Sequence, residues 1–170
     1  IAKRLNTTPT SSLGRLFDAV AAMLGLGTVN RFEAELPMAL EAITRPDIEG
    51  AYPIQIDQTE RLWQWRHEPI LEGIIQDIRS GRDTGAIATR FHNTVSLALL
   101  TLAQMARAAT GITTAALSGG VFCNRYLAER LIRQLKDDDF CVLWKTRIPA
   151  NDGGIALGQA AIAAAMLEKS

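Results

Sequence analysis

Cysteine is scarce in this 170-residue sequence, which contains two residues of that type, Cys123 and Cys141. They lie on different predicted elements and lack the CxxC spacing of zinc sites and thiol redox motifs. This spacing argues against a zinc site or a disulfide scaffold, and it fits a reducing cytoplasm.

An excess of charge is also missing, because 18 Lys and Arg residues balance 18 Asp and Glu residues. Without a basic excess or a clustered basic run, generic binding to nucleic acid or to an anionic membrane has no support. The apolar stretches are amphipathic or shorter than the roughly 18 residues of a membrane span, and no signal peptide is visible. We therefore expect neither a membrane nor nucleic acid as a partner.

Histidine is equally rare, and His67 and His92 are its two examples. Neither has a second histidine four residues away or a cysteine nearby. A capping or packing role is therefore favoured over metal binding for both.

With 48% apolar residues, the chain can bury an ordinary core, and its length predicts a single domain over residues 1–170. It begins with Ile1 rather than Met, so we expect a fragment of a longer protein. Apolar periodicity predicts helices over residues 14–24, 32–44, 68–78, 84–109, 125–136 and 155–167, and strands over 52–57, 62–65, 112–117 and 140–144. The alternation of strand, loop and helix toward the C-terminus predicts a helix-rich α/β fold, with the helical first half packed around the sheet.

Four finer expectations belong to the same pattern. Residues 1–6 have the pattern of a helix end, and Phe32 is expected on the inward face of helix 32–44. Trp63 and Trp65 are expected to pack an edge. The aspartates at 137–139 are expected to be a solvated helix end, because three adjacent side chains point in different directions.

The central motif is the pair Gly119 and Gly120, which lies where a predicted strand turns into a helix. Two glycines allow positive φ and close approach to a ligand, and the free N–H groups of a helix start suit a phosphate. A single such pair is usually only a tight turn.

A second motif, Asn151-Asp152-Gly153-Gly154, repeats the arrangement before the helix predicted at 155–167. Asp152 at such a turn is either an N-cap or a ligand for a hard cation near phosphate oxygens. Because the two glycine motifs each open a helix, their combination favours a ligand site over two unrelated turns.

Helix 14–24 contributes a third candidate feature. Gly14 and Asp18 are four residues apart and share a helix face, where a carboxylate could accept ribose hydroxyls. From the residues alone, a solvated helical aspartate is the favoured alternative.

Residues 118–125 (SGGVFCNR) and 149–160 (PANDGGIALGQA) resemble the C-terminal part of the HypF-type carbamoyltransferases of [NiFe]-hydrogenase maturation. Residues 10–20 (TSSLGRLFDAV) and 32–41 (FEAELPMALE) are similar to the same family, in the same order. The resemblance implies one lobe of the actin, sugar-kinase and Hsp70-like nucleotide-binding fold. The enzymes that form threonylcarbamoyladenosine on tRNA are more distant relatives.

The resemblance also implies a two-step chemistry. A carbamoyl group from carbamoyl phosphate is activated with ATP as carbamoyl-adenylate, in a domain absent from this sequence. The domain to which this lobe belongs then transfers the group to the C-terminal cysteine of a HypE-type maturation partner.

By position, the resemblance implies that Gly119 and Gly120 bind the nucleotide phosphate and that Asn124 contacts the nucleotide. Gly14 and Asp18 would line the adenosine side, and Gly153 would belong to the second nucleotide loop. Asp152 would be a ligand of a divalent metal, which could be Mg, Zn or Fe.

The sequence departs from the family pattern in two ways. The family's HxxxH metal-binding pair is expected in a preceding lobe and does not occur here, so Asp152 alone cannot hold a metal tightly. Cys123 stands where the family is expected to have Gln, and no His or Asp at motif spacing would activate it as a nucleophile.

Two alternatives to the HypF-type carbamoyltransferase lobe stay open. One is the corresponding lobe of a tRNA-modifying relative, and the other is a non-catalytic docking module of the same fold.

Overall fold

The computed structural model describes residues 10–59, 62–144 and 147–168. The predicted helix end at residues 1–6 lies outside this part of the chain. The elements in chain order are α1 (Leu13–Met23), α2 (Glu35–Ala42), β1 (Gln55–Gln58), β2 (Trp63–Arg66), α3 (Glu68–Arg79), α4 (Thr84–Thr110), β3 (Thr114–Ala116), the 3-10 turn η1 (Gly120–Cys123), α5 (Arg125–Asp137), β4 (Cys141–Leu143), the 3-10 turn η2 (Asp152–Gly154) and α6 (Ile155–Leu167).

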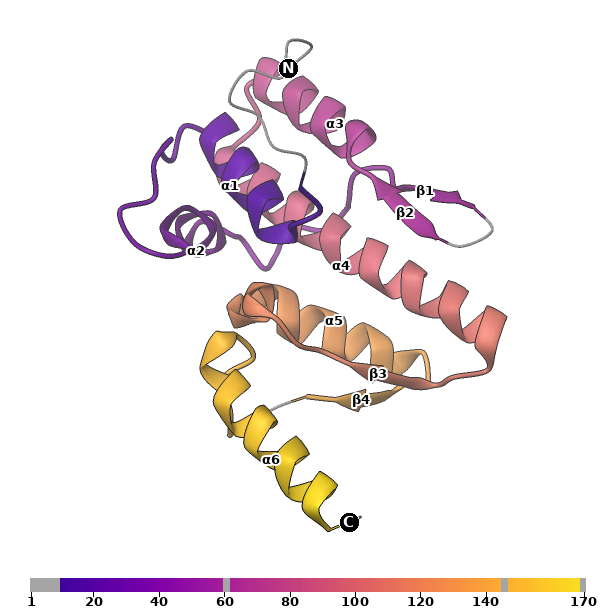
Figure 1. The fold of residues 1–170 in the computed structure, drawn as a ribbon. Helices are drawn as coiled ribbons and strands as arrows, with labels where there is room; N and C mark the ends of the chain where they lie inside the picture. The colour runs from indigo at the N-terminus through magenta and orange to yellow at the C-terminus, as the bar shows by residue number, and fades with distance from the viewer. Residues whose placement is uncertain (1–9, 60–61, 145–146, 169–170) are drawn as a thin grey trace.

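The long helix α4 is the central element, with α1, α2 and α3 on one part of its length and α5 beside it (Figure 1). Asp83 caps its start by accepting a hydrogen bond from the Ala86 N–H at 3.0 Å, and Gly111 ends it in the left-handed conformation. The N-terminal half of α4 is buried on nearly all sides, so it buries polar side chains as well as apolar ones. The buried polar residues of α4 are Thr89, His92, Asn93, Thr94 and Ser96.

Two hydrophobic clusters stabilise the fold. The larger one joins α1, α2, α3 and the first half of α4, and includes Phe17, Ile74 and Phe91. The smaller one joins β3, α5 and β4 around Leu131, and Leu99 of α4 packs against both clusters. The helix α4 therefore links the two halves of the molecule.

The strands pair as two separate two-stranded sheets. β1 and β2, which lie within the strands predicted at 52–57 and 62–65 apart from their last residues, pair as an antiparallel hairpin, with Ile56 opposite Trp65. β3 and β4 are parallel, with Ala115 opposite Val142, and α5 connects them. The prediction of a helix-rich α/β structure is confirmed, and both glycine motifs follow the carboxyl ends of the parallel strands.

The prediction for Phe32 is wrong, because its side chain is 56% exposed. The helix begins three residues later, at Glu35, and Asn30 binds its first turn by accepting a hydrogen bond from the Leu36 N–H at 2.8 Å. Ala34, just before the helix, has a positive φ of 60°, which interrupts the predicted helical run. Phe32 therefore lies in the loop that leads into α2.

The expectation of three solvated aspartates is also wrong for Asp138. Its carboxylate accepts hydrogen bonds from Gln104 at 2.9 Å and from Arg107 at 3.0 Å. These contacts join the end of α5 to the C-terminal half of α4 and hold the pKa of Asp138 below its ordinary value. Tertiary packing thus makes this acidic residue an anchor.

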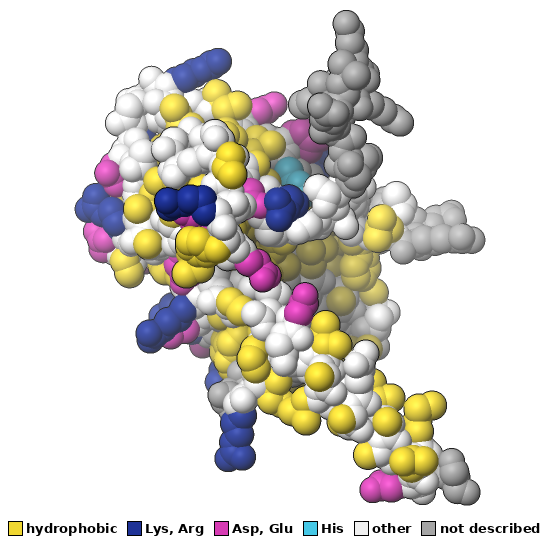
Figure 2. All heavy atoms as spheres, turned by 60° about the vertical axis from the view of Figure 1, so that its left-hand side comes forward, with side chains coloured by type: hydrophobic (Ala, Val, Ile, Leu, Met, Phe, Trp, Pro, Cys, Tyr) yellow, Lys and Arg dark blue, Asp and Glu magenta, His cyan; other side chains and the backbone are white. Residues whose placement is uncertain are grey.

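The last helix, α6, projects from the body of the molecule (Figures 1 and 2). Its apolar side chains are exposed along its length, and they include Ile155, Leu157, Ile162 and Leu167. None of the helices in the described part of the chain is both long enough and apolar enough to cross a bilayer.

Candidate functional site

A cavity of about 560 Å³ lies between the start of α1, the loop and first turns of α2, and the two glycine motifs. We call it the α1–glycine-loop pocket. Its lining residues are Ser12, Gly14, Arg15, Phe17, Asp18, Asn30, Glu33, Ala34, Pro37, Met38, Glu41, Gly120, Val121, Cys123, Asn124 and Asn151. Segments that are far apart in the sequence therefore form one site.

Four of the predicted site residues line this pocket. Gly14 and Asp18 come from α1, whereas Gly120 and Asn124 come from the turn η1 and the start of α5. The other three predicted residues, which do not line the pocket, are Gly119, Asp152 and Gly153.

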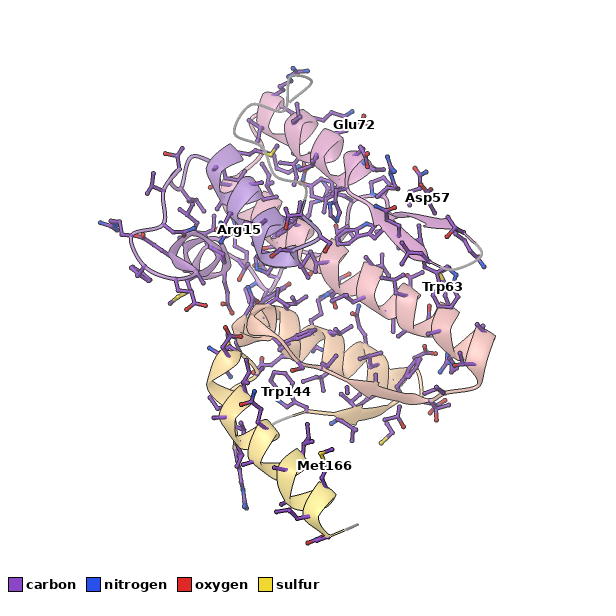
Figure 3. The ribbon with its side chains drawn as sticks, in the orientation of Figure 1. Arg15, Asp57, Trp63, Glu72, Trp144 and Met166 are labelled. Carbon is purple, nitrogen blue, oxygen red and sulfur yellow. The ribbon has the colours of Figure 1, made fainter. Side chains whose placement is uncertain are left out.

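Asp18 is held by two neighbouring polar groups. Its carboxylate contacts the Arg15 guanidinium at 3.1 Å and accepts a hydrogen bond from the Asn30 amide at 2.9 Å. Arg15 projects from α1 (Figure 3), and its side chain is 67% exposed. Because Asn30 also binds the first turn of α2, the Asp18 side chain connects α1 to α2.

Gly119 has φ of 104° and ψ of 158°, a conformation available mainly to glycine. Its N–H donates to the carbonyl oxygen of Ala150 at 2.7 Å. This N–H therefore ties the first glycine motif to the second and is not free for a phosphate in this structure. Gly120 opens η1, where the first N–H groups of a helical turn have no partner within that turn.

Asn124 is the N-cap of α5. Its Oδ1 accepts a hydrogen bond from the Leu127 N–H at 2.8 Å, and its Nδ2 lies 2.9 Å from His92 Nε2. The residue is only 9% exposed. Both ends of its amide are thus engaged within the protein, even though the residue lines the pocket.

The second glycine motif uses Asn151 rather than Asp152 as its cap. Asn151 Oδ1 accepts a hydrogen bond from the Gly153 N–H at 3.1 Å, and Asp152 is exposed. Within residues 10–59, 62–144 and 147–168, no group of three His, Cys, Asp or Glu side chains could hold a metal ion. The described residues therefore do not form a metal site by themselves.

Both histidines make packing contacts, as the sequence favours. His92 is fully buried, and burial lowers its pKa to about 4 although the Ala88 carbonyl opposes this shift. His67 precedes α3 without a side-chain capping bond, and its ring packs edge-on against Trp65 at 5.0 Å. Cys123 and Cys141 are free thiols, as expected.

The pocket combines two kinds of binding group. Three carboxylates line it, from Asp18, Glu33 and Glu41, and Arg15 is the one cation among its described lining residues. Carboxylates accept hydrogen bonds from hydroxyl and amino groups. The starts of α1 and α5 supply helix N-termini, which favour an anion. A ligand with hydroxyl groups at one end and a phosphate at the other fits this distribution.

Sequence reasoning missed Asn30, Glu33 and Glu41 as lining residues. Glu41 accepts a hydrogen bond from the Tyr126 N–H at 3.0 Å and thereby connects α2 to α5. Asn30 carries a recognisable signal, since Asn in a loop before a helix is a frequent capping residue. For Glu33 and Glu41 we find no comparable signal in the sequence.

A second cavity, of about 450 Å³, lies between α4, β3 and α5. Its lining is almost entirely apolar, with Leu99, Ile112 and Phe122 among its residues, and none of its described lining residues is charged.

Comparison with known proteins identifies related sequences and structures. The family model described as "Carbamoyltransferase, Kae1-like Domain, second subdomain" matches residues 1–159. Carbamoyltransferase HypF of Synechocystis sp. is 39% identical over 151 residues, which cover 88% of this chain and 19% of that protein. Carbamoyltransferase HypF of Rhizobium leguminosarum is 39% identical over 160 residues, which cover 92% of this chain and 20% of that protein.

Two solved structures are also similar. A crystal structure of full-length HypF in the phosphate- and nucleotide-bound form has a TM-score of 0.91 and 42% identity, covering 99% of this chain and 22% of that one. The structure of T. kodakarensis HypF has a TM-score of 0.80 and 29% identity. The chain thus spans about a fifth of the length of the proteins that it matches.

Proposed function

The chain belongs to the HypF carbamoyltransferase family, and on this basis we propose that it is the nucleotide-binding lobe of a carbamoyltransferase. The lobe binds carbamoyl-adenylate or ATP within one half of an actin-like, sugar-kinase-like nucleotide-binding fold. The complete enzyme uses carbamoyl phosphate and transfers the carbamoyl group to the C-terminal cysteine of a HypE-type partner, in the cytoplasm.

The observation that carries this proposal is the α1–glycine-loop pocket. It joins Gly14 and Asp18 of α1 to Gly120 and Asn124 of the first glycine motif and to Asn151 of the second. A nucleotide needs hydroxyl acceptors and phosphate donors at a fixed separation, and this pocket contains both. The relative that was crystallised with phosphate and nucleotide adds support from within the family.

In the proposed complex, Asp18 accepts hydrogen bonds from the ribose hydroxyls, and Gly14 allows the adenosine to approach α1 closely. The Gly120 N–H donates to the phosphate at the start of η1. Gly119, Gly153 and Asn124 belong to the nucleotide site as supports, because their polar groups hold the loops and the α5 start in place.

The proposed transfer is a displacement at the carbamoyl carbon. The thiolate sulfur of the partner's cysteine forms a bond to that carbon, and the bond from the carbon to the AMP phosphate oxygen breaks. AMP leaves with the bonding electrons, and the thiol proton passes to solvent before the attack. Within this lobe, the residues' contribution is to bind and orient the nucleotide, which brings the reacting groups together.

A divalent metal, with Asp152 as a ligand, is part of the proposal inherited from the family. A single exposed carboxylate is a weak metal ligand, so the remaining ligands have to come from outside the described residues. We assign no step of the transfer to this metal.

A docking module is the second candidate function. The exposed apolar surface of α6, with Ile155, Leu157 and Ile162, supports it, because large exposed apolar patches mark interaction surfaces. The tRNA-modifying relative has no specific observation in its favour, and the balanced charge adds little for a nucleic-acid partner.

An Asp152→Ala substitution in a full-length enzyme that carries this chain separates the two functions. Loss of ATP-dependent transfer with partner binding intact supports the enzyme, whereas retained transfer favours the docking module.

A second experiment is a titration of glycine-labelled protein with ATP and Mg²⁺, followed by NMR. The NMR signals of Gly14 and Gly120 should shift selectively. Gly81, in the turn after α3, serves as the reference signal that should not move.

A further inference from the structure

His92 is fully buried in α4 and contacts residues of two different elements that line the α1–glycine-loop pocket. Its ring packs edge-on against Phe17 of α1, with the centroids 5.2 Å apart. Its Nε2 lies 2.9 Å from the Asn124 amide at the start of α5. Phe17 and Asn124 both line the pocket, whereas His92 lies behind them.

The hydrogen bonds around His92 assign its protons. The Ala88 carbonyl oxygen, 2.7 Å from Nδ1, can only accept, so Nδ1 carries the proton. Asn124 Oδ1 accepts from the Leu127 N–H, which leaves the Asn124 NH₂ group to face the imidazole. Nε2 is therefore the acceptor, and the neutral ring has no nitrogen left for a metal or a ligand.

A packing role alone does not account for a histidine at this position. The ring lies among Phe17, Phe91 and Tyr126, in a cluster where an apolar side chain would avoid the cost of burying two nitrogens. What the imidazole adds over an apolar side chain of similar size is its hydrogen bond to the Asn124 amide. That bond fixes the amide that caps α5, and the capped turn follows directly after Gly120–Cys123.

We infer that His92 is a positioning residue of the nucleotide site, which acts through Asn124. By orienting the α5 cap from behind, it holds the Gly120 N–H at a fixed place relative to Asp18 on α1. This inference rests on the proposed nucleotide-binding function. His92 thus has a role in the site although it binds no ligand itself.

The test compares His92→Leu with His92→Gln in a full-length enzyme that carries this chain. Leucine removes the acceptor at the Nε2 position, whereas the Gln side-chain oxygen can replace it. Each variant is titrated with ATP, and its melting temperature is measured. Ile74→Ala, which opens a cavity beside α3 outside the pocket, is the control for a loss of stability without a change at the site.

We expect His92→Leu to weaken ATP binding by about three- to tenfold, the worth of one hydrogen bond, and His92→Gln to restore most of this loss. Ile74→Ala should bind ATP as the wild type does, despite its lower melting temperature. Unchanged ATP affinity in His92→Leu, or equal losses in both His92 variants and Ile74→Ala, would overturn the inference.

A double-mutant cycle that combines His92→Leu with Asn124→Ser tests the route through Asn124. Serine still caps α5 but cannot reach His92. If His92 acts through Asn124, then adding His92→Leu to Asn124→Ser should change ATP affinity by less than twofold, although the same substitution should weaken binding about three- to tenfold in the wild-type background. Additive losses contradict the inference. Failure of the wild-type enzyme to bind ATP, or insensitivity of binding to Asp18→Asn, contradicts the proposed function instead.

Discussion

The Gly119 N–H donates a hydrogen bond to the Ala150 carbonyl oxygen at 2.7 Å. This bond joins the two glycine motifs at the carboxyl ends of β3 and β4. The backbone ladder also continues past the strands, because the Leu117 N–H donates to the Leu143 carbonyl at 3.1 Å. The two motifs are therefore one structural unit, in which a change to one loop affects the position of the other.

Substitution of Gly119 by alanine should destabilise the protein through its backbone. An added Cβ would meet nothing within 4 Å, so the cost comes from φ of 104° and not from a clash. We expect a loss of about 1–3 kcal/mol in the free energy of unfolding, measured with urea. Gly120→Ala is the matched control, since its Cβ would meet only the Asn151 Cβ at 3.9 Å, and it should change stability by less than about 1 kcal/mol. Equal losses in the two variants would show that the strain argument fails.

Asp77 should be one of the most sensitive charged residues. It is 8% exposed and accepts hydrogen bonds from Tyr52 Oη at 2.7 Å and Arg82 Nε at 2.8 Å, and it also pairs with Arg90. We expect Asp77→Asn to cost about 3 kcal/mol in the free energy of unfolding, the low end for a broken buried pair, because Arg82 still reaches solvent. Tyr52→Phe, which removes one hydroxyl, should cost about 1 kcal/mol and serves as the comparison.

The same carboxyl predicts an acid-dependent loss of stability. Burial raises the pKa of Asp77, but the hydrogen bonds from Tyr52 and Arg82 and the charges of Arg90 and Arg82 together lower it below its ordinary value. A lowered folded-state pKa means that the contribution is present above the unfolded-state pKa and is lost as the pH falls through the folded-state value. The free energy of unfolding, measured with urea, should therefore fall more steeply below about pH 4 in the wild type than in Asp77→Asn.

His92 predicts a second pH effect, in a higher window. Because burial lowers its folded-state pKa to about 4, the unfolded chain binds more protons between that value and the ordinary value of 6.5. The free energy of unfolding should decrease as the pH falls through this window, by up to about 3 kcal/mol. Above pH 6.5 the contribution is complete. The His92→Gln variant has no such group, so a slope identical to the wild type's would rule out His92 as its source.

Asp138 should contribute to stability in a salt-dependent way. Its hydrogen bonds to Gln104 and Arg107 join α5 to α4, whereas Asp137 is exposed at the helix end. We expect Asp138→Ala to lower the melting temperature more than Asp137→Ala does. The difference between the two variants should shrink in 1 M NaCl, because salt screens partly exposed ion pairs.

Asp18 provides the functional prediction for the ribose end of the pocket. If its carboxylate accepts hydrogen bonds from ribose hydroxyls, Asp18→Asn should weaken ATP binding to a full-length enzyme about tenfold. The wild type should also prefer ATP to 2′,3′-dideoxy-ATP, and the variant should lose most of that preference. Asp137→Asn, a change at an exposed carboxylate outside the pocket, is the control. An unchanged preference in Asp18→Asn would place the ribose elsewhere.

Periodicity and capping residues predicted most of the secondary structure, because they act over one or two helical turns. The helix predicted at 155–167 has the bounds of α6, and the one predicted at 125–136 differs from α5 by a single residue. The four strands were also predicted, with ends that differ by a few residues. Phe32 was misplaced because Asn30, six residues before Leu36, binds the first turn of α2 and sets where the helix starts.

The residues of the candidate site were partly predictable. Gly14, Asp18, Gly120 and Asn124 were selected from the sequence, and all four line the pocket. The use of their polar groups was not predictable, since the Asn124 amide binds His92, 32 residues away in the sequence. The anchoring of Asp138 likewise depends on Gln104 and Arg107, which precede it by 34 and 31 residues.

By itself, the sequence determined the order of the elements, the glycine motifs at the ends of the parallel strands and the absence of a charge excess. These properties follow from composition and from local backbone preferences, both of which can be read directly from the sequence. The tertiary structure alone decided that α1, α2 and the two glycine motifs enclose one pocket, and that His92 contacts two of its lining residues, Phe17 and Asn124. Such contacts depend on how α4 packs against α1 and α5, and packing between distant segments leaves no periodic signal along the chain.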